Sequence, residues 1–231
     1  MAVLAGVAVL AALVVFFVQP LGVLGLLERL TPQMMYCVKT EQRQVGLSFD
    51  DGPNPNFTPQ VLEILEKHKA KATFFLISER ARRSPELVGR IRAAGHEIGN
   101  HYIRDGSLLG HSEVEFLLNL EETEKTLGIA AGAKLFRPPG GVARPRQLRL
   151  ARERGYQCVL GCAYPHDPMH PPVWYIEWLI KKNLRAGTIV ILHDGISDAS
   201  RSVRALPGIL EAGQRKGLRF VSIGELMKDA Q

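Results

Sequence analysis

The stretch Ser48-Phe49-Asp50-Asp51-Gly52-Pro53 decides how the rest of the chain is interpreted. A short, mostly apolar run at 44–49 ends in two adjacent carboxylates, and a Gly-Pro turn follows them. Adjacent acids at a strand end repel each other and lose hydration, so a fold needs a cation or a proton-transfer task to offset that cost. We therefore expect the chemistry of this protein to begin at Asp50 and Asp51.

Short apolar runs alternate with helical patterns along the rest of the chain. After the run at 44–49, the strand candidates are 72–77, 96–99, 134–136, 156–162, 188–192 and 218–223. The helical patterns between them carry start signals such as Thr58-Pro59 and the capping box from Ser112 to Glu115. Alternation of this kind predicts an α/β fold with a parallel sheet and helices outside it.

Chemically active side chains follow different predicted strands. They are Asp50, Asp51, His101, Arg137, Asp167 and His193. An open sheet would leave some of them far apart, whereas a barrel-like closure brings all of them together over its C-terminal rim. We therefore predict a distorted (β/α) barrel of about seven parallel strands, preceded by one hydrophobic transmembrane helix.

The transmembrane prediction depends on the first 27 residues. Residues 2–27 contain no charged side chain, and as a helix they would span about 39 Å, enough to cross a bilayer. A cleaved signal peptide is the alternative, but no Lys or Arg precedes the apolar run and no clear small-x-small site follows it. The predicted organisation is a membrane anchor at 1–27, a linker at 28–43 and a soluble domain at 44–231.

Composition excludes several classes of protein. Apolar residues make up 46% of the chain and charged residues 23%, as in ordinary globular folds rather than disordered ones. Lys and Arg exceed Asp and Glu by 29 to 23, for a formal net charge of +6. The arginine-rich stretches at 80–92 and 144–154 fall in helical patterns without interleaved aromatic residues, so we do not expect nucleic-acid binding.

Cysteines and tryptophans receive structural interpretations. Cys158 and Cys162 share one predicted strand, where four residues span about 13 Å, too far for a bridge. With Cys37 they make no disulfide framework, and the redox compartment stays open. The aromatic cluster Trp174, Tyr175 and Trp178 is interpreted as helix packing, with a sugar-binding platform as the alternative.

Five motifs, in order, resemble those of the NodB-homology polysaccharide deacetylases, carbohydrate esterase family 4. The resemblance covers about residues 44–227. The matching segments are Ser48 to Pro53 at T-F-D-D-G-P, His101 to Asp105 at H-x-x-x-H, Phe136 to Gly141 at R-P-P-Y-G, Asp167 at D-W, and Ile191 to His193 at L-x-H.

The resemblance implies metal-dependent hydrolysis of the N-acetyl group of an amino-sugar glycan such as chitin oligomers or peptidoglycan. It makes Asp50 the general base and His193 the general acid that protonates the leaving amine. The metal ligands would be Asp51, His101 and Asp105. The implied cofactor is a divalent metal ion. Zn²⁺ is the first expectation, and Mn²⁺, Fe²⁺ or Co²⁺ are alternatives because Asp105 would add a carboxylate ligand.

The resemblance also implies supporting residues. Arg137 and Asp167 would pair, with Arg137 in turn orienting Asp50. Gly140 stands where the family has a Tyr whose backbone N–H contacts the oxyanion, and glycine keeps that N–H. Ile191 is expected to line the acetyl pocket, together with Pro139.

Departures from the family pattern leave alternatives open. Asp105 replaces the second ligand histidine, and an anionic ligand there would make a weaker Lewis acid. His111 is another candidate for the missing imidazole, and Pro168 replaces the Trp of the D-W motif. The rival function is a catalytically impaired protein that binds a glycan or a partner; an aspartyl-phosphate phosphatase is disfavoured because its acids need an intervening residue.

Location follows from the resemblance rather than from charge. The first positive charges, Arg29, Lys39 and Arg43, all follow the apolar segment, which weakly favours a cytoplasmic domain. Members of the family usually act outside the cytoplasm. We therefore expect a single-pass, membrane-anchored protein with an extracytoplasmic catalytic domain, whose partners are the glycan and the membrane.

Overall fold

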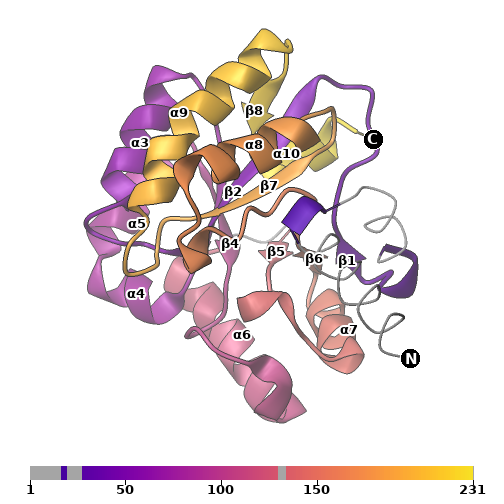
Figure 1. Cartoon of the computed structure of the whole chain (residues 1–231). Helices are drawn as coiled ribbons and strands as arrows, with labels where there is room; N and C mark the ends of the chain where they lie inside the picture. Colours follow the sequence, from indigo (N-terminus) through magenta and orange to yellow (C-terminus); the bar gives the residue numbers. More distant parts are fainter. Residues whose placement is uncertain (1–16, 20–27, 130–133, 231) are drawn as a thin grey trace, which may run out of the picture.

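Strand β2 (Gln44–Gly52) is buried over its whole length and carries the two acids at its carboxyl end. In the computed structural model, which describes residues 17–19, 28–129 and 134–230, it lies between two parallel neighbours (Figure 1). These are β3 (Thr73–Leu76) and β7 (Ile189–His193). Because both faces of β2 are covered, its sequence is mostly apolar instead of alternating with polar residues.

All strand pairs of the sheet are parallel. The remaining strands are β1 (Met34–Met35), β4 (Glu97–Asn100), β5 (Lys134–Phe136), β6 (Tyr156–Val159) and β8 (Arg219–Val221). Their order is β1-β6-β5-β4-β3-β2-β7, and β8 pairs with the start of β2. Beyond β6, Ala163 forms a parallel bridge with Val190 of β7, so the sheet curls back on itself. The prediction of a distorted barrel of parallel strands is confirmed, and each of the seven predicted strands is present.

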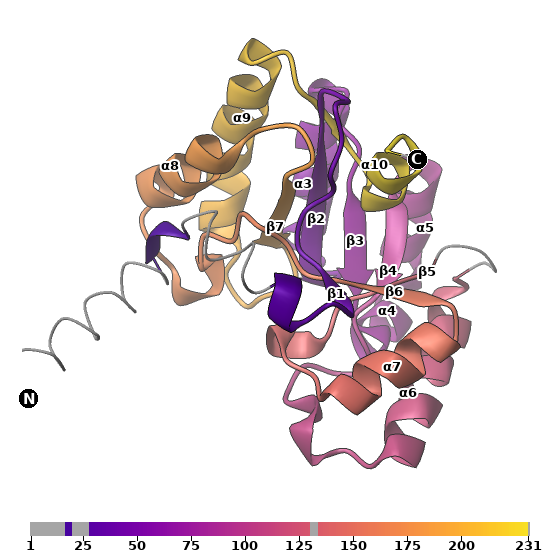
Figure 2. The ribbon, with the colours of Figure 1, turned by 90° about the vertical axis from the view of Figure 1, so that its right-hand side faces the viewer.

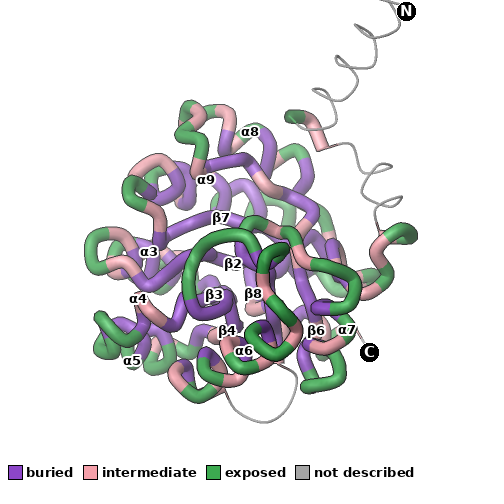
Figure 3. Tube along the Cα trace, turned by 90° about the horizontal axis from the view of Figure 1, so that it is seen from below, coloured by how far each residue is buried: buried purple, intermediate pink, exposed green. Residues whose placement is uncertain are grey.

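Helices pack side by side around the outside of the sheet. They are α3 (Thr58–Lys67), α4 (Ser78–Arg83), α5 (Pro85–Ala93), α6 (Glu113–Leu127), α7 (Pro145–Glu153), α8 (Val173–Asn183) and α9 (Ser200–Arg215). Their neighbour order is α8, α9, α3, α5, α4, α6 and α7 (Figures 1 and 2). Ser112 accepts a hydrogen bond from the backbone N–H of Glu115, as its predicted role as a cap requires. Seen from below, the strands are mostly buried, and the exposed segments lie at the periphery and in loops that pass in front of the sheet (Figure 3).

The side chains of β2 alternate between two different environments. Leu47 and Phe49 pack outward in the main hydrophobic cluster beneath the helices. Gly46, by contrast, faces helix α10 (Ile223–Lys228), and a Cβ there would lie 3.0 Å from the side chain of Leu226. Since side chains alternate along a strand, Ser48 and Asp50 share the inward face with Gly46. The barrel is therefore filled by α10 at one end and becomes polar toward the other.

Residues 28–43 are part of the folded unit, although the sequence was interpreted as a linker there. Met34 of β1 and the neighbouring Tyr36 are buried in a cluster that includes Phe136. Cys37 forms a disulfide with Cys162, with 5.8 Å between their Cα atoms. The expectation that Cys158 and Cys162 do not bridge each other is confirmed, since Cys158 is a free thiol. The Cys37–Cys162 bridge was missed because β6 ends at Val159, so Cys162 lies beyond the strand and reaches the chain that follows β1.

The predicted membrane anchor at 1–27 falls almost entirely outside the described residues. Of this segment, the structure describes only 17–19. Within the described ranges, no helix is long and apolar enough to cross a bilayer. The anchor therefore stays a prediction.

Replacing both Cys37 and Cys162 by serine should lower the free energy of unfolding by about 2–4 kcal/mol. The bridge joins residues separated by 125 positions, and its loss frees that loop in the unfolded chain. Urea unfolding followed by circular dichroism measures the change. A reductant should lower the free energy of unfolding of the wild type by the same amount and leave that of the double variant unchanged. Equal stability of the oxidised wild type and the double variant would contradict the prediction.

Candidate active site

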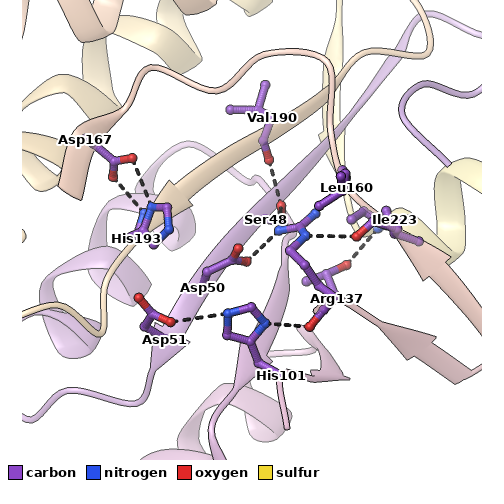
Figure 4. A network of polar contacts seen from close by, with 12 residues as sticks. Ser48, Asp50, Asp51, His101, Arg137, Leu160, Asp167, Val190, His193 and Ile223 are labelled. Carbon is purple, nitrogen blue, oxygen red and sulfur yellow. Dashed lines mark hydrogen bonds and ion pairs between the residues drawn. The ribbon is translucent and has the colours of Figure 1, made fainter. Parts of the chain in front are cut away.

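Arg137 lies in the centre of the barrel, only 1% exposed, immediately after β5. Its Nη1 donates hydrogen bonds to Asp50 Oδ1 at 2.5 Å and to Ser48 Oγ at 2.8 Å (Figure 4). Its Nε and Nη2 donate to the carbonyls of Val159 and Leu160. Burial lowers the pKa of Arg137, and the Asp50 carboxylate opposes that effect. The predicted base is therefore held as the partner of a fixed guanidinium.

Asp51 and His101 face each other from the ends of β2 and β4. Asp51 has a φ of 68°, and its Oδ1 lies 3.2 Å from His101 Nε2 (Figure 4). His101 Nδ1 donates to the carbonyl of Arg137 at 2.8 Å, which fixes the ring with Nε2 toward Asp51. Burial opposes the charge on Asp51, but the hydrogen bond and positive charge of His101, with His193 and Arg80, lower its pKa to about 2.

His193, the last residue of β7, is held by Asp167 of the short helix η3 (Asp167–Met169). Asp167 Oδ1 lies 3.0 Å from His193 Nδ1, and Oδ2 accepts the backbone N–H of His193 at 2.8 Å. Ser202 Oγ donates to the same Oδ2 at 2.6 Å. Burial alone would lower the pKa of His193, but the charge and hydrogen bond of Asp167, together with the charges of Asp50 and Asp51, raise it to about 9. The imidazole therefore carries a proton at neutral pH.

The predicted pairing of Arg137 with Asp167 was wrong. Among the described contacts, Arg137 pairs with Asp50, and Asp167 pairs with His193. The reason is the bridge between the segment after β6 and strand β7, since the chain that follows it reaches the end of β7 instead of the barrel centre.

A pocket of about 470 Å³ collects most of the predicted site. Its lining includes the predicted residues Asp50, Asp51, His101, Asp105, Arg137, Gly140, Ile191 and His193. Asp167 supports His193 from behind, and Pro139 is buried without lining the pocket. The backbone turns at Gly140, with a φ of 63°, and presents the glycine to the pocket, so the role of Pro139 in the substrate pocket stays a prediction.

Sequence reasoning missed several pocket residues that follow β6. Leu160, Gly161 and Tyr164 complete the wall opposite the two acids. A Cβ on Gly161 would lie 2.7 Å from the side chain of Ile191, so a glycine lets this segment approach β7. The signal that could have found them is their place at the carboxyl end of a strand, where the loops of such barrels form their sites.

Metal-ligating chemistry is present in part. The described residues contain no group of three or more His, Cys, Asp or Glu side chains placed to hold a metal ion. Asp105 lines the pocket but is exposed, and its Oδ1 accepts the backbone N–H of Gly106. Asp51 and His101 supply two donors of the kinds that bind a divalent cation such as Zn²⁺, a carboxylate oxygen and an imidazole nitrogen 3.2 Å apart, and the Arg137 carbonyl holds the imidazole from behind.

The alternative imidazole, His111, lies outside the pocket. Its Nδ1 is 2.9 Å from the hydroxyl of Tyr102 and 3.6 Å from Oε1 of Glu115, in the first turn of α6. His111 is not among the residues that line the pocket. It therefore does not supply the ligand that Asp105 replaces.

Comparison with known proteins agrees with this geometry. Residues 38–159 match the family described as polysaccharide deacetylase. A peptidoglycan-N-acetylglucosamine deacetylase of Bacillus cereus is 39% identical over 201 residues, which covers 86% of this chain and 94% of the relative. A chitooligosaccharide deacetylase of Sinorhizobium fredii is 34% identical, covering 78% of this chain and 89% of the relative. The crystal structure of the Bc1960 peptidoglycan N-acetylglucosamine deacetylase aligns with a TM-score of 0.80 at 32% identity, covering 85% of this chain and 93% of that one.

Replacing Arg137 by methionine should lower the free energy of unfolding by about 3–5 kcal/mol, because Asp50 is left buried without its partner. Adding Asp50→Asn in the same background removes that charge and should recover at least about 1 kcal/mol. The matched control is Arg82→Met, which breaks an exposed ion pair with Glu122 and should cost less than about 1 kcal/mol. Denaturant unfolding measures these three variants and the single variant Asp50→Asn, and strictly additive effects of the Arg137 and Asp50 changes would refute the coupling.

Proposed function

The chain belongs to the polysaccharide deacetylase family, and on that basis we propose that it removes N-acetyl groups from an amino-sugar glycan by metal-dependent hydrolysis. The observation that carries the proposal is the pairing of opposite charges around one pocket. A carboxylate, Asp50, and a protonated imidazole, His193, reach it from adjacent strands and are each held by a buried partner. Hydrolysis of an amide needs both functions, a base for the attacking water and an acid for the leaving amine.

The proposed substrate class is a glycan that contains N-acetylglucosamine. The relatives are described as deacetylases of peptidoglycan N-acetylglucosamine and of chitooligosaccharides. Both descriptions share the acetamido group of an amino sugar. The pocket wall of Leu160, Tyr164 and Ile191 offers apolar surface to the methyl of that group.

Asp50 is proposed to take the proton from the attacking water. The hydrogen bond from the guanidinium of Arg137 fixes the direction of the Asp50 carboxylate. Arg137 also donates to Ser48 on the same strand, so guanidinium and base keep one relative position. The Asp50 carboxylate is therefore already oriented to accept a proton, without a change in its position.

His193 is proposed to give its proton to the leaving amine. Asp167 holds Nδ1, so Nε2 is the nitrogen left for the substrate. The carbonyl oxygen that becomes negative in the reaction is expected to meet the backbone N–H of Gly140, which lines the same pocket.

Asp51 and His101 are the residues proposed to hold the metal. A divalent cation bound there would polarise the acetyl carbonyl and lower the pKa of the attacking water. Asp105 lines the same pocket and would join them only if its loop turned the carboxylate toward them. Zn²⁺ is the first expectation, with Mn²⁺, Fe²⁺ or Co²⁺ as alternatives that suit an additional carboxylate.

The proposed location is outside the cytoplasm, on a single membrane anchor formed by the apolar sequence at 2–27. The disulfide between Cys37 and Cys162 supports this side of the membrane, because structural disulfides persist mainly in oxidising compartments. A topology reporter fused after Gln231 tests it.

The full chain, loaded with Zn²⁺, Co²⁺ or Mn²⁺, should release acetate from chitooligosaccharides or peptidoglycan fragments. Asp50→Asn and His193→Asn should each lower turnover by at least about a hundredfold, because each removes a proton-transfer group. Binding of the metal, measured by calorimetry, should persist in His193→Asn. Glycan binding without acetate release at full metal occupancy would instead identify the impaired binding protein and overturn the proposal.

Asp105→His should tighten Zn²⁺ binding by at least about tenfold, the scale on which changes around a metal site act. The reason is that an imidazole is a better zinc ligand at this position than an exposed carboxylate that bonds to its own loop. Competition with a chromogenic chelator measures affinity apart from turnover, and Asp105→Asn is the control. Unchanged affinity in both variants would mean that position 105 is not a ligand.

Asp167→Asn should move the alkaline limb of the rate profile to lower pH by about 1–2 units. The raised pKa of His193, about 9, means that its proton is present at neutral pH and is lost as the pH rises through that value. The same sign holds for stability, which this ion pair supports below the ordinary pKa of histidine and ceases to support above about pH 9. Ser202→Ala keeps the carboxylate charge and should shift the limb far less. An identical shift in both variants would contradict the assignment.

A further inference from the structure

Helix α8 exposes the two tryptophans of the chain on one face. Trp174 is 68% exposed and Trp178 is 42% exposed, one helical turn apart. The opposite face of α8, with Ile176 and Ile180, is buried in the main hydrophobic cluster. The interpretation of these tryptophans as helix packing was therefore wrong, because the aliphatic residues of α8 make the packing face and leave the indoles in solvent.

Basic side chains continue the same face. Lys182 is exposed, with its Nζ 5.4 Å from the centre of the Trp178 ring, and Arg185 is exposed just after the helix. The acid of α8, Glu177, already pairs with Lys181. We call the set Trp174, Trp178, Lys182 and Arg185 the α8 face. Tryptophan beside Lys and Arg is the composition of surfaces that lie at the membrane interface and meet anionic headgroups.

Residues 17 and 18 meet the domain at this helix. The hydroxyl of Tyr175 donates to the carbonyl of Phe17 at 2.9 Å, and Lys182 Nζ donates to the carbonyl of Val18 at 3.1 Å. Figure 2 shows the ribbon of residues 17–18 beside α8. These residues belong to the uncharged stretch at 2–27. A chain that enters a bilayer from this point holds α8 close to the headgroups.

We propose that the α8 face docks on lipid headgroups beside the apolar residues 17–18 that lie against this helix, and this proposal rests on the membrane anchoring proposed above. The contact is separate from the hydrolytic chemistry and stands whether or not the site turns over. A glycan occupant is disfavoured because a neutral sugar gains nothing from Lys182 and Arg185, and because the backbone of residues 17–18 already lies against α8. Only residues 169–172 separate α8 from Pro168 of the pocket wall, so the docked domain works near the membrane surface.

Tryptophan fluorescence tests the proposal directly, because both tryptophans of the chain lie on this face. The full chain is reconstituted in vesicles of phosphatidylcholine and phosphatidylglycerol, with and without bromine near the top of the acyl chains. The variants Trp174→Phe and Trp178→Phe report on one indole each. Both single tryptophans should show blue-shifted emission that bromolipid quenches, as expected for side chains about 5–10 Å into the headgroup boundary.

Charge reversal provides the second readout and its control. Lys182→Glu with Arg185→Glu should lower the ratio of docked to undocked protein by at least about tenfold in anionic vesicles. The matched control reverses two exposed arginines on α4 and α5, Arg83→Glu with Arg90→Glu, and should leave quenching unchanged. Tryptophan emission that bromolipid does not quench overturns the proposal. Emission that is unchanged by lipid but shifts when soluble chitooligosaccharide is added overturns it in favour of a glycan-binding surface.

Discussion

The buried ion pair between Arg137 and Asp50 is the constraint on which the rest of the site depends. A guanidinium inside a barrel is costly to desolvate unless each of its donors finds an acceptor. Here it meets Asp50, Ser48 and two carbonyls that follow or end β6, and its plane lies 4.0 Å from the centre of the Phe75 ring. The backbone carbonyl of the same residue holds His101. One arginine thus positions both the proposed base and a proposed ligand, and it ties β2 to the β5 and β6 side of the sheet.

The two carboxylates therefore have different roles at one pocket. Asp50 is paired with a permanent cation, so its negative charge is offset while its free oxygen faces the pocket. Asp167 is buried beneath an imidazole, so its charge keeps a proton on His193. The two roles follow from the partner of each carboxylate: Arg137 pairs with the proposed base Asp50, whereas Asp167 pairs with the proposed acid His193.

Much of this arrangement could be predicted from the sequence because it depends on local patterns. The seven longer strands are buried runs between helices, and the site residues follow their ends, so alternation alone places Asp50, His101 and His193 on one rim. Features that depend on distant contacts could not be predicted. Strand β1 has two residues and no period, and the partner of Cys37 is set by the chain leaving β6. Likewise, the aromatic residues of α8 look like a packing face until Ile176 and Ile180 are seen to occupy it.

The proposed ligands differ in how firmly the fold holds them, and this difference bears on the metal. Asp51 is the bulged residue of β2 between the paired Asp50 and Gly52, and its carbonyl accepts from Arg80. His101 directly follows β4, and its N–H donates to the carbonyl of Leu76, so the strands on either side hold both positions. Asp105 lies in the loop after β4, next to Gly106, whose φ of 130° only glycine adopts readily. Turning that loop inward would order exposed backbone and cost conformational entropy. The affinity of the site for a cation should therefore depend on the loop at position 105 more than on the two residues that the strands already hold.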